Sequence, residues 1–408
     1  MTTHVWSPDE AAYVDAFVES TGDELVAFRR RIHAHPELSG REFAITEALK
    51  SRLEVAHLAP QVLPSGTGII CDVGPDANDA TAPTVALRAD LDALAMGDET
   101  ATAYRSKVPG VAHACGHDVH TTVLLGAGLA LAKLLARPGA PRGRVRLIFE
   151  PSEETVPGGA VEVIECGYLD GVGGVFGLHC DPKVDLGHVG VVEGPITSAA
   201  DIVEISLTGP GGHTARPERT IDLIGIAGRV ANEVPEMLAS GMNGHGPIRM
   251  VFGALRAGDA PNVIPTSAKL YGTLRSRNSE DWELGPKLLE AAIAQVVDST
   301  GASWSLSHRR GVPPVVNDPG ATRLLVTAVE NALGPDGVVE TDQSWGGDSF
   351  AWFLQRAPGS YARLGVHDPA STGPRLDLHA STFEPDERSI AVGVRVMAAT
   401  ALAWLRSI

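Results

Sequence analysis

The 408-residue chain has little positive charge. It carries 33 Lys and Arg residues against 50 Asp and Glu residues, which gives a formal net charge of -17. Such an acidic excess argues against nucleic acid or an anionic membrane as a partner, because both are polyanions. A small anionic substrate is still allowed, since one arginine can hold a carboxylate locally.

Cysteine and long apolar runs are also scarce. The 4 cysteines are too few for a disulfide scaffold in a chain of this length. The most apolar stretch, residues 121–136, contains Lys133 and falls short of the roughly 20 residues that span a membrane, which predicts a buried helix. The first ten residues, MTTHVWSPDE, lack the basic segment and apolar core of an export signal. We therefore expect a cytoplasmic protein.

Length and composition predict a globular chain with two domains. Hydrophobic residues make up 44% and charged residues 20% of the chain, as in folded proteins. One domain usually takes about 100–200 residues, so 408 residues exceed a single core.

Strands alternating with helices predict an α/β sheet, mostly parallel, in both flanks of the chain. Ser7, Pro8 and Glu10 form a helix start with a capping box, and we expect this helix to break at Gly22. The remaining helices of the flanks are expected at 23–34, 41–58, 120–136, 321–333 and 388–405, and the strands at 68–73, 85–91, 145–149, 175–178 and 361–365.

The middle of the chain has a different order of elements. It reads strand 202–207, helix 221–238, strand 248–255, strand 268–274, helix 280–297 and strand 303–307. This β-α-β-β-α-β order is the ferredoxin-like pattern, which can fold as a small domain. We predict a discontinuous catalytic domain, residues 1–198 and 311–408, interrupted by an inserted domain, residues 199–310.

The densest group of chemically active side chains is the segment HACGHDVH, residues 113–120. Residues two apart in an extended segment face the same side, so Cys115 and His117 could both hold one metal ion. The alternative is a loop with a few polar side chains. A thiol and imidazoles crowded together without a disulfide framework favour the metal.

An acidic pair follows the expected strand 145–149. Ligands gather at such strand ends, and here Glu153 and Glu154 are adjacent. One carboxylate could bind metal while the other takes a proton from water. Taken alone, an acidic pair is more often a solvated turn.

Three further histidines complete the set. His179 stands where an expected strand ends, and His379 stands ahead of Phe383; taken singly, each is more often structural than a ligand. In the inserted domain, the paired glycines before His213 give a tight backbone that could present its ring to a cavity, although an exposed turn histidine is equally compatible. Taken together with Cys115 and His117, these residues make the structural alternatives improbable.

The ordered motifs resemble the amidohydrolase branch of the zinc-type exopeptidases and aminoacylases. The resemblance runs nearly the whole length of the chain, and it implies a di-metal exopeptidase-like α/β domain with an inserted ferredoxin-like lid and dimerisation domain. The motifs are RRIHAHPELS (30–39), RADLDAL (88–94), CGHD (115–118), PSEE (151–154), His179, GGH (211–213), NVIP (262–265), GTLR (272–275) and His379.

The resemblance implies a role for each matching residue. The ligands of a centre with one or two divalent ions would be Cys115, His117, Glu154, His179 and His379. Glu153 would be the general base, and Asp118 would support the ligands without touching metal. His213 and Asn262 would reach the substrate from the lid, and Arg275 would hold its carboxylate.

The ligand types and the resemblance also bear on cofactor, partner and reaction. A thiolate, imidazoles and a carboxylate suit zinc best, with manganese, cobalt or nickel left open. The expected reaction is hydrolysis of the amide bond of an N-acyl amino acid by a homodimer that pairs through the lid. A carboxypeptidase or dipeptidase, or a deacetylase of the N-acetyl-diaminopimelate type, would use the same metal machinery. A metal-binding protein without catalysis would need neither a free base nor a lid histidine.

Some positions depart from the family pattern. Ala95 stands where proline is usual, Glu150 stands where glutamine is common, and GGDSF, residues 346–350, replaces a GGEDF run through Asp348 and Ser349. None of these changes removes an expected ligand, so they bear on specificity more than on the reaction type.

Overall fold

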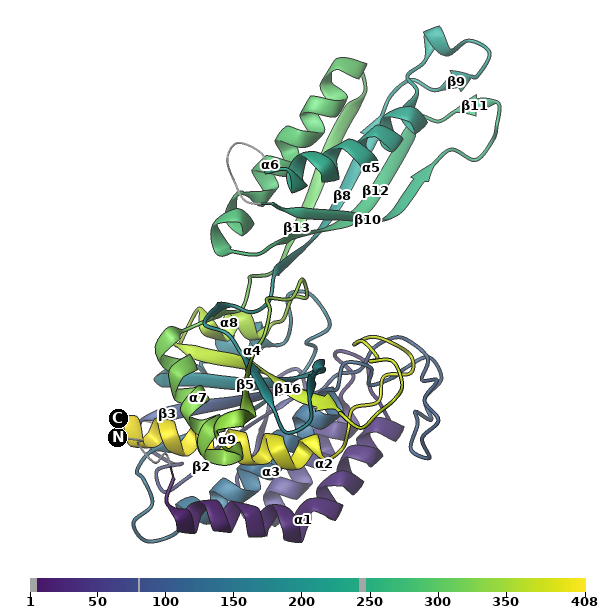
Figure 1. The fold of residues 1–408 in the computed structure, drawn as a ribbon. Coiled ribbons are helices and arrows are strands. Elements are labelled where there is room, and N and C mark those ends of the chain that lie inside the picture. The colour runs from purple at the N-terminus through teal and green to yellow at the C-terminus, as the bar shows by residue number, and fades with distance from the viewer. Residues whose placement is uncertain (1–5, 80, 242–246) are drawn as a thin grey trace. The chain divides into compact units, whose positions relative to one another are not determined.

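A computed structural model describes residues 6–79, 81–241 and 247–408 (Figure 1). The first five residues, on which the expected absence of an export signal partly rests, lie outside the described residues. The chain divides into two compact units. Unit 1 comprises Met1–Ile196, Val316–Asp342 and Ser349–Ile408, and unit 2 comprises Thr197–Val315 and Gln343–Asp348.

Unit 1 is built on an eight-stranded mixed sheet in the order β1-β2-β4-β3-β5-β16-β6-β15. Its central pairs, β4 with β3, β3 with β5 and β5 with β16, are parallel. Every residue of β3 and β4 is buried, as expected for central parallel strands covered on both faces. The strands are β1 (Gln61–Val62), β2 (Ile69–Val73), β3 (Thr84–Asp90), β4 (Arg144–Glu150), β5 (Val172–Asp185), β6 (Val189–Val191), β15 (Val338–Glu340) and β16 (Gly359–His367).

Two apolar helices, α3 (His117–Leu135) and α9 (Ser389–Ser407), pack on the central strands β3 and β5, and α1 (Pro8–Ala34) packs against both (Figure 1). By length and composition alone, α3 and α9 could cross a membrane, but 83% and 78% of their apolar windows are buried in the protein. Such burial is typical of core helices. The other helices of unit 1 are α2 (Phe43–Val55), α4 (Ala160–Glu165), α7 (Pro319–Leu333) and α8 (Phe350–Leu354).

Helix α1 begins as predicted but does not break at Gly22. Ser7 caps it, and the reciprocal bonds of the capping box with Glu10 are present. The expected break is wrong because apolar residues on both sides of the glycine, including Val18 and Leu25, lie in one buried stripe. A glycine costs a helix only about 1 kcal/mol, which this continuous packing outweighs.

Unit 2 is a four-stranded antiparallel sheet in the order β10-β12-β8-β13, with two helices packed on one face (Figure 1). Its order along the chain is β-α-β-β-α-β, and the small pair of strands β9 and β11 is added to it. The elements are β8 (Ala199–Thr208), β9 (Gly212–His213), α5 (Leu223–Ala239), β10 (Arg249–Ala257), β11 (Val263–Ile264), β12 (Ser267–Ser276), α6 (Ser279–Val297) and β13 (Ser303–Val312).

Unit 2 also contains a segment from far along the chain. Residues 343–348 belong to it, although the sequence assigned them to the catalytic domain. The Ser198 amide donates to the Gly346 carbonyl at 2.8 Å, and the Gln343 side-chain amide donates to the Thr197 carbonyl at 2.9 Å. These hydrogen bonds join residues that are far apart in the sequence, and no pattern of apolar residues could have predicted them.

Candidate metal centre

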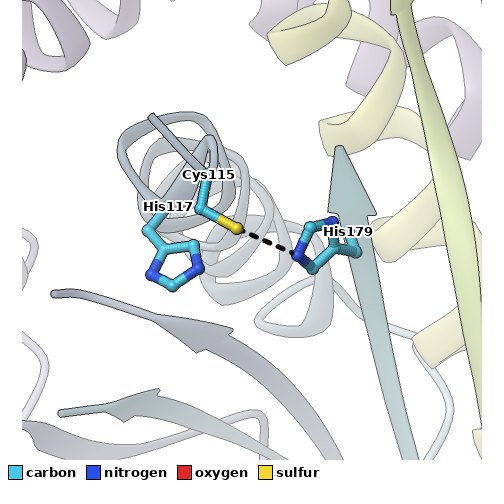
Figure 2. A group of neighbouring side chains, drawn as sticks. All are labelled: Cys115, His117 and His179. Atoms are coloured by element: carbon cyan, nitrogen blue, oxygen red, sulfur yellow. Dashed lines mark hydrogen bonds between the residues drawn. The ribbon is translucent and has the colours of Figure 1, made fainter. Parts of the chain in front are cut away.

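Cys115, His117 and His179 form the buried part of the site (Figure 2). Cys115 directly precedes helix α3, His117 begins it, and His179 lies on β5. The Cys115 Sγ lies 3.5 Å from the His179 Nε2, and one ligand atom from each of the three residues lies within 4.8 Å of the others. A thiolate and two imidazoles at such distances are a typical zinc ligand set.

Gly116 allows this geometry at the start of α3. Its φ of 90° lies in the left-handed region, which residues with a side chain rarely adopt. A Cβ atom at this position would lie 2.8 Å from both the Cβ and the Sγ of Cys180. The glycine therefore lets Cys115 and His117 turn toward the same point while the backbone packs against β5.

Glu154 and His379 form a second group with the same thiol. Ligand atoms of Cys115, Glu154 and His379 lie within 4.8 Å of one another, and the His379 Nε2 is 3.3 Å from the Glu154 Oε1. His379 has a positive φ of 62°, and its amide donates to the Ala114 carbonyl at 2.8 Å. This bond fixes the loop that carries His379 to the segment that carries the thiol.

Glu153 is adjacent to this second group. Its carboxylate meets His117 and Glu154 within the same 4.8 Å limit, and its Oε1 accepts the Ser349 amide at 3.2 Å. The five expected ligands and the expected base are thus gathered within unit 1. Because the groups of possible ligands share members, they could hold one ion or two.

Two orphaned atoms test whether a cation fits. The His117 Nε2 and the Glu154 Oε1 are buried and have no hydrogen-bond partner among the described residues, and they lie 3.8 Å apart. A buried acceptor without a partner costs on the order of 1–3 kcal/mol, and more when it is charged. A divalent ion between them would satisfy both atoms, so the residues present fit a metal.

Asp92 orients two of the expected ligands, although no role for it was predicted from the sequence. Its Oδ1 lies 3.2 Å from the His117 Nδ1, and its Oδ2 accepts the Glu154 amide at 2.9 Å. A hydrogen bond from Nδ1 leaves the lone pair of Nε2 free for a metal. Burial raises the pKa of Asp92, but the hydrogen bond and charge of His117 outweigh it and hold that pKa below its usual value. Its place in the RADLDAL motif, at the end of β3, was the available signal.

Asp118 has contacts other than those expected. Its Oδ2 lies 2.6 Å from the Arg29 Nε and 2.8 Å from the His33 Nδ1, both on α1. Among the described residues its side chain makes no hydrogen bond to an expected ligand. Burial opposes the charged carboxylate, but Arg29 and His33 hold the pKa of Asp118 well below its usual range. Asp118 thus ties the start of α3 to α1, and direct support of a ligand falls to Asp92.

His120 also lies near the cluster but is not available as a ligand. Its Nδ1 is 2.6 Å from the Asp90 Oδ1, and its Nε2 accepts the Cys180 amide at 2.7 Å. Both ring nitrogens are therefore used by the protein. Although Asp90, His117 and His120 lie close enough to surround an ion, we assign this trio to the fold.

Burial sets the charge of the thiol in the protein without metal. It raises the pKa of Cys115 well above its ordinary value, with His117 partly opposing the shift. Burial likewise lowers the pKa of His179 far below its ordinary value, so that ring is neutral. A neutral imidazole can bind a metal directly, whereas the thiol must first lose its proton, which a bound dication favours strongly.

The remaining candidates lie in unit 2. His213 is exposed on β9, opposite Val263 of β11, and the Thr214 amide donates to the Asn262 carbonyl at 3.2 Å. The His213 Nδ1 accepts the Ala215 amide at 3.1 Å. In the neutral ring the proton therefore resides on Nε2, which leaves a donor directed away from the backbone.

Arg275 lies on β12 and is half-buried. Its Nη1 donates to the Trp345 carbonyl at 2.9 Å, and it makes no ion pair with any residue in 6–79, 81–241 or 247–408. Burial and the neighbouring Arg249 lower its pKa from the ordinary value. A surface arginine usually pairs with a neighbouring acid, and the described contacts of Arg275 do not show such a pair.

Comparison with known proteins gives one family. The model of peptidase family M20/M25/M40 matches residues 86–403. A probable hydrolase from Synechocystis is 35% identical over 94% of this chain and 96% of its own length. An N-acetyl-L-cysteine deacetylase from Bacillus subtilis is 33% identical over 90% of this chain and 85% of its own length.

A relative from Rhodococcus jostii, described as a glutamate–cysteine ligase, is 45% identical over 92% of this chain but only 46% of its own length. This chain therefore spans about half of that protein, whose activity does not transfer to it. Among solved structures, a dinuclear metal-binding peptidase of family M20 from Bacillus subtilis superimposes with a TM-score of 0.81 at 30% identity, covering 96% of this chain and 99% of that one.

Proposed function

Because this chain belongs to peptidase family M20/M25/M40, we propose that it is a metal-dependent amidohydrolase that cleaves N-acyl amino acids to a carboxylate and a free amino acid. The observation that carries the proposal is the gathering of Cys115, His117, Glu154, His179 and His379, with Glu153 beside them. Two atoms of this group, the His117 Nε2 and the Glu154 Oε1, are buried and have no hydrogen-bond partner among the described residues. A binding protein would not need a carboxylate left over for proton transfer.

The five ligands would hold one or two divalent ions. Zinc suits the thiolate, imidazole and carboxylate donors best, and manganese, cobalt and nickel are compatible with the imidazoles and the carboxylate. When bound, such an ion supplies Lewis acidity, which polarises the amide carbonyl and lowers the pKa of a water molecule toward about 7.

Glu153 would perform the proton transfers. Its carboxylate accepts a proton from the attacking water and later delivers it to the leaving amine. The Ser349 amide holds its Oε1, so its position is defined before substrate binds. A general base needs such a fixed position within hydrogen-bond reach of its water.

Unit 2 would supply polar contacts to the substrate. The proton on the His213 Nε2 is suited to stabilise the oxyanion of the tetrahedral intermediate, and Asn262 would contact the acyl or amino-acid part. Arg275, which has no acidic partner among the described residues, would hold the free carboxylate. These three roles rest on the resemblance in sequence and on the contacts within unit 2.

A homodimer through unit 2 is part of the proposal. Strand β10 lies at the edge of the sheet and exposes Val251 (53%) and Leu255 (44%), and α5 exposes Ile224 (50%). An apolar edge strand is a ready template for pairing with a second copy.

Light scattering should report a dimer for the wild type and a monomer for Val251→Lys. The control Val55→Lys, at an exposed position in unit 1, should remain dimeric.

The net charge of -17 supports the proposal that the protein has no nucleic-acid or membrane partner. The small number of cysteines supports a cytoplasmic location. A carboxypeptidase or a diaminopimelate-type deacetylase is the second candidate, because the same centre would serve it. The test is a panel of N-acyl amino acids, N-acetylcysteine included, against unblocked dipeptides and N-acetyl-diaminopimelate, with products identified by mass spectrometry. Cleavage of the N-acyl amino acids supports the proposal, whereas cleavage of dipeptides alone would replace it with the peptidase.

A further inference from the structure

Ser349 links two carboxylates of unit 1. Its hydroxyl donates to the Glu150 Oε1 at 2.6 Å, and its backbone amide donates to the Glu153 Oε1 at 3.2 Å. Glu150 and Ser349 are fully buried, and 199 positions separate them along the chain. Ser349 thus connects the expected base, Glu153, to the buried carboxylate of Glu150.

Arg88 anchors this arrangement from β3. Its Nε donates to the Glu150 Oε2 at 2.6 Å, and its Nη2 donates to the Ser349 Oγ at 3.0 Å. The Ser349 hydroxyl therefore accepts from the arginine and donates to the glutamate, which leaves its rotor no freedom. The other Glu150 oxygen also accepts the Ala160 amide at 2.6 Å, so Glu150 is held from three sides.

Arg88 contributes a positive charge to this group. Its guanidinium contacts the carboxylates of Asp90 and Glu150, while Ser349 contributes a neutral hydroxyl. Because Arg88 donates to both Glu150 and Ser349, a carboxylate at position 349 could replace the one at position 150 as its partner.

We propose that Glu150 and Ser349 are a matched pair of positioning residues which, held by Arg88, fix the amide that orients Glu153. The proposal rests on the proposed function of Glu153 as the proton acceptor. Either member changed alone disturbs the pair. Ser349→Asp would place a third carboxylate against the buried Arg88 guanidinium, and Glu150→Gln would remove one of the two that contact it.

Substitutions at Glu150 or Ser349 should lower turnover rather than weaken substrate binding. None of the three residues is an expected metal ligand or substrate contact, so they act through the Ser349 backbone. Loss of the two hydrogen bonds of the Ser349 hydroxyl lets the segment that contains Ser349 shift. The Glu153 carboxylate is then no longer held in one orientation. Residues that orient a metal site from behind typically change its activity by about 10- to 100-fold when altered.

The experiment compares wild type, Glu150→Gln, Ser349→Asp, the double variant Glu150→Gln/Ser349→Asp, and Ser349→Ala. We expect each single variant to lower kcat by about 10- to 100-fold, with KM and bound metal close to wild type. The double variant should recover most of the lost turnover, because it restores the number of buried charges. Ser360→Ala is the matched control, since Ser360 is equally buried but bonds to Thr322 outside the site. Its kcat should equal that of wild type.

A kcat of the double variant equal to the product of the two single losses would overturn the pairing. If a charge variant fails to fold, Ser349→Ala still tests the positioning role. Wild-type turnover in Ser349→Ala would overturn that role. Glu153→Gln, measured alongside, separates the two proposals. If it is inactive while the double variant is additive, only the pairing fails. If it is fully active, the assignment of the base fails and the pairing fails with it.

Discussion

Cys115 gives the residue-scale test of metal binding. The chain has three other cysteines for comparison: Cys71 and Cys180 are buried, and Cys166 is exposed. If Cys115 ligates metal, chelation should increase its rate of alkylation, because the ion no longer holds the sulfur. Peptide mass spectrometry after iodoacetamide treatment measures this rate.

The other thiols supply the controls. Cys166 should react equally with and without chelator, and Cys71, whose pKa burial raises to about 12, should stay unreactive in both. Cys115 remains buried without metal, so its rate after chelation should still lie below that of Cys166. Equal labelling of Cys115 in the two states would remove it from the ligand set.

Arg275 carries the prediction on substrate charge. A guanidinium can bind both oxygens of a carboxylate, which lysine cannot imitate. Arg275→Ala should therefore lower kcat/KM for an N-acyl amino acid but not for the corresponding amide. The expected loss of transition-state stabilisation is about 1.5–3 kcal/mol, the usual strength of a hydrogen bond to a charged group. Arg275→Lys should be impaired in the same direction.

The matched control is Arg256→Ala, which removes an exposed arginine that stacks on Tyr271 in the same unit. Its kcat/KM should not change for either substrate. Equal losses on acid and amide in Arg275→Ala would show that this residue does not recognise the carboxylate.

At this scale, the sequence could predict the side chains that gather at the candidate metal centre but not those that orient them. Cys115 and His117 are conspicuous because a thiol and an imidazole stand two positions apart. Asp92 and Arg88 act on partners 25 and 62 positions away, and such pairings depend on the order of strands in the sheet. Asp118 was expected from the resemblance to support the ligands, whereas its side chain contacts Arg29 and His33 of α1.

At the scale of elements, the start of α3 determines where two ligands lie. Gly116→Ala would place a side chain in the left-handed region, at about 1–2 kcal/mol, and also force its Cβ against Cys180. We expect a loss of stability larger than this and a weaker affinity for metal, since Cys115 and His117 flank the glycine. Urea unfolding and competitive metal titration measure the two effects.

Gly139→Ala separates the two contributions. Gly139 also has a positive φ of 82°, but nothing lies within 4 Å of an added Cβ. This control should lose only about 1–2 kcal/mol and bind metal normally. If the two variants lose the same stability and retain the same affinity, the contact with Cys180 has no part in shaping the site.

Elements with a clear apolar period were predictable, and those fixed by packing or by a few backbone bonds were not. Most strands at the centre of unit 1 and most main elements of unit 2 lie within a few residues of their predicted bounds. Strand β5 continues to Asp185 instead of ending at 178, and β13 continues to Val312 instead of ending at 307. Helix α1 was divided wrongly at Gly22, because the buried stripe that overrides a glycine is a property of the folded core. The short strands β9 and β11, two residues each, carry no periodic signal at all.

At the scale of the whole molecule, the order of elements predicted an α/β unit interrupted by a ferredoxin-like one. The return of residues 343–348 to unit 2 escaped prediction, because it depends on hydrogen bonds such as that from Ser198 to Gly346. Family membership rests on most of the chain, since the family model matches residues 86–403.

The most direct test of the account is turnover of an N-acyl amino acid by Glu153→Gln, measured together with bound metal. Glutamine has nearly the same shape as glutamate but cannot accept a proton. We predict metal content close to wild type and a kcat lower by about 10²–10⁴-fold, the usual contribution of general acid–base catalysis. Glu165→Gln, at an exposed position on α4, is the control and should be fully active. Wild-type turnover in Glu153→Gln with metal still bound would contradict the account.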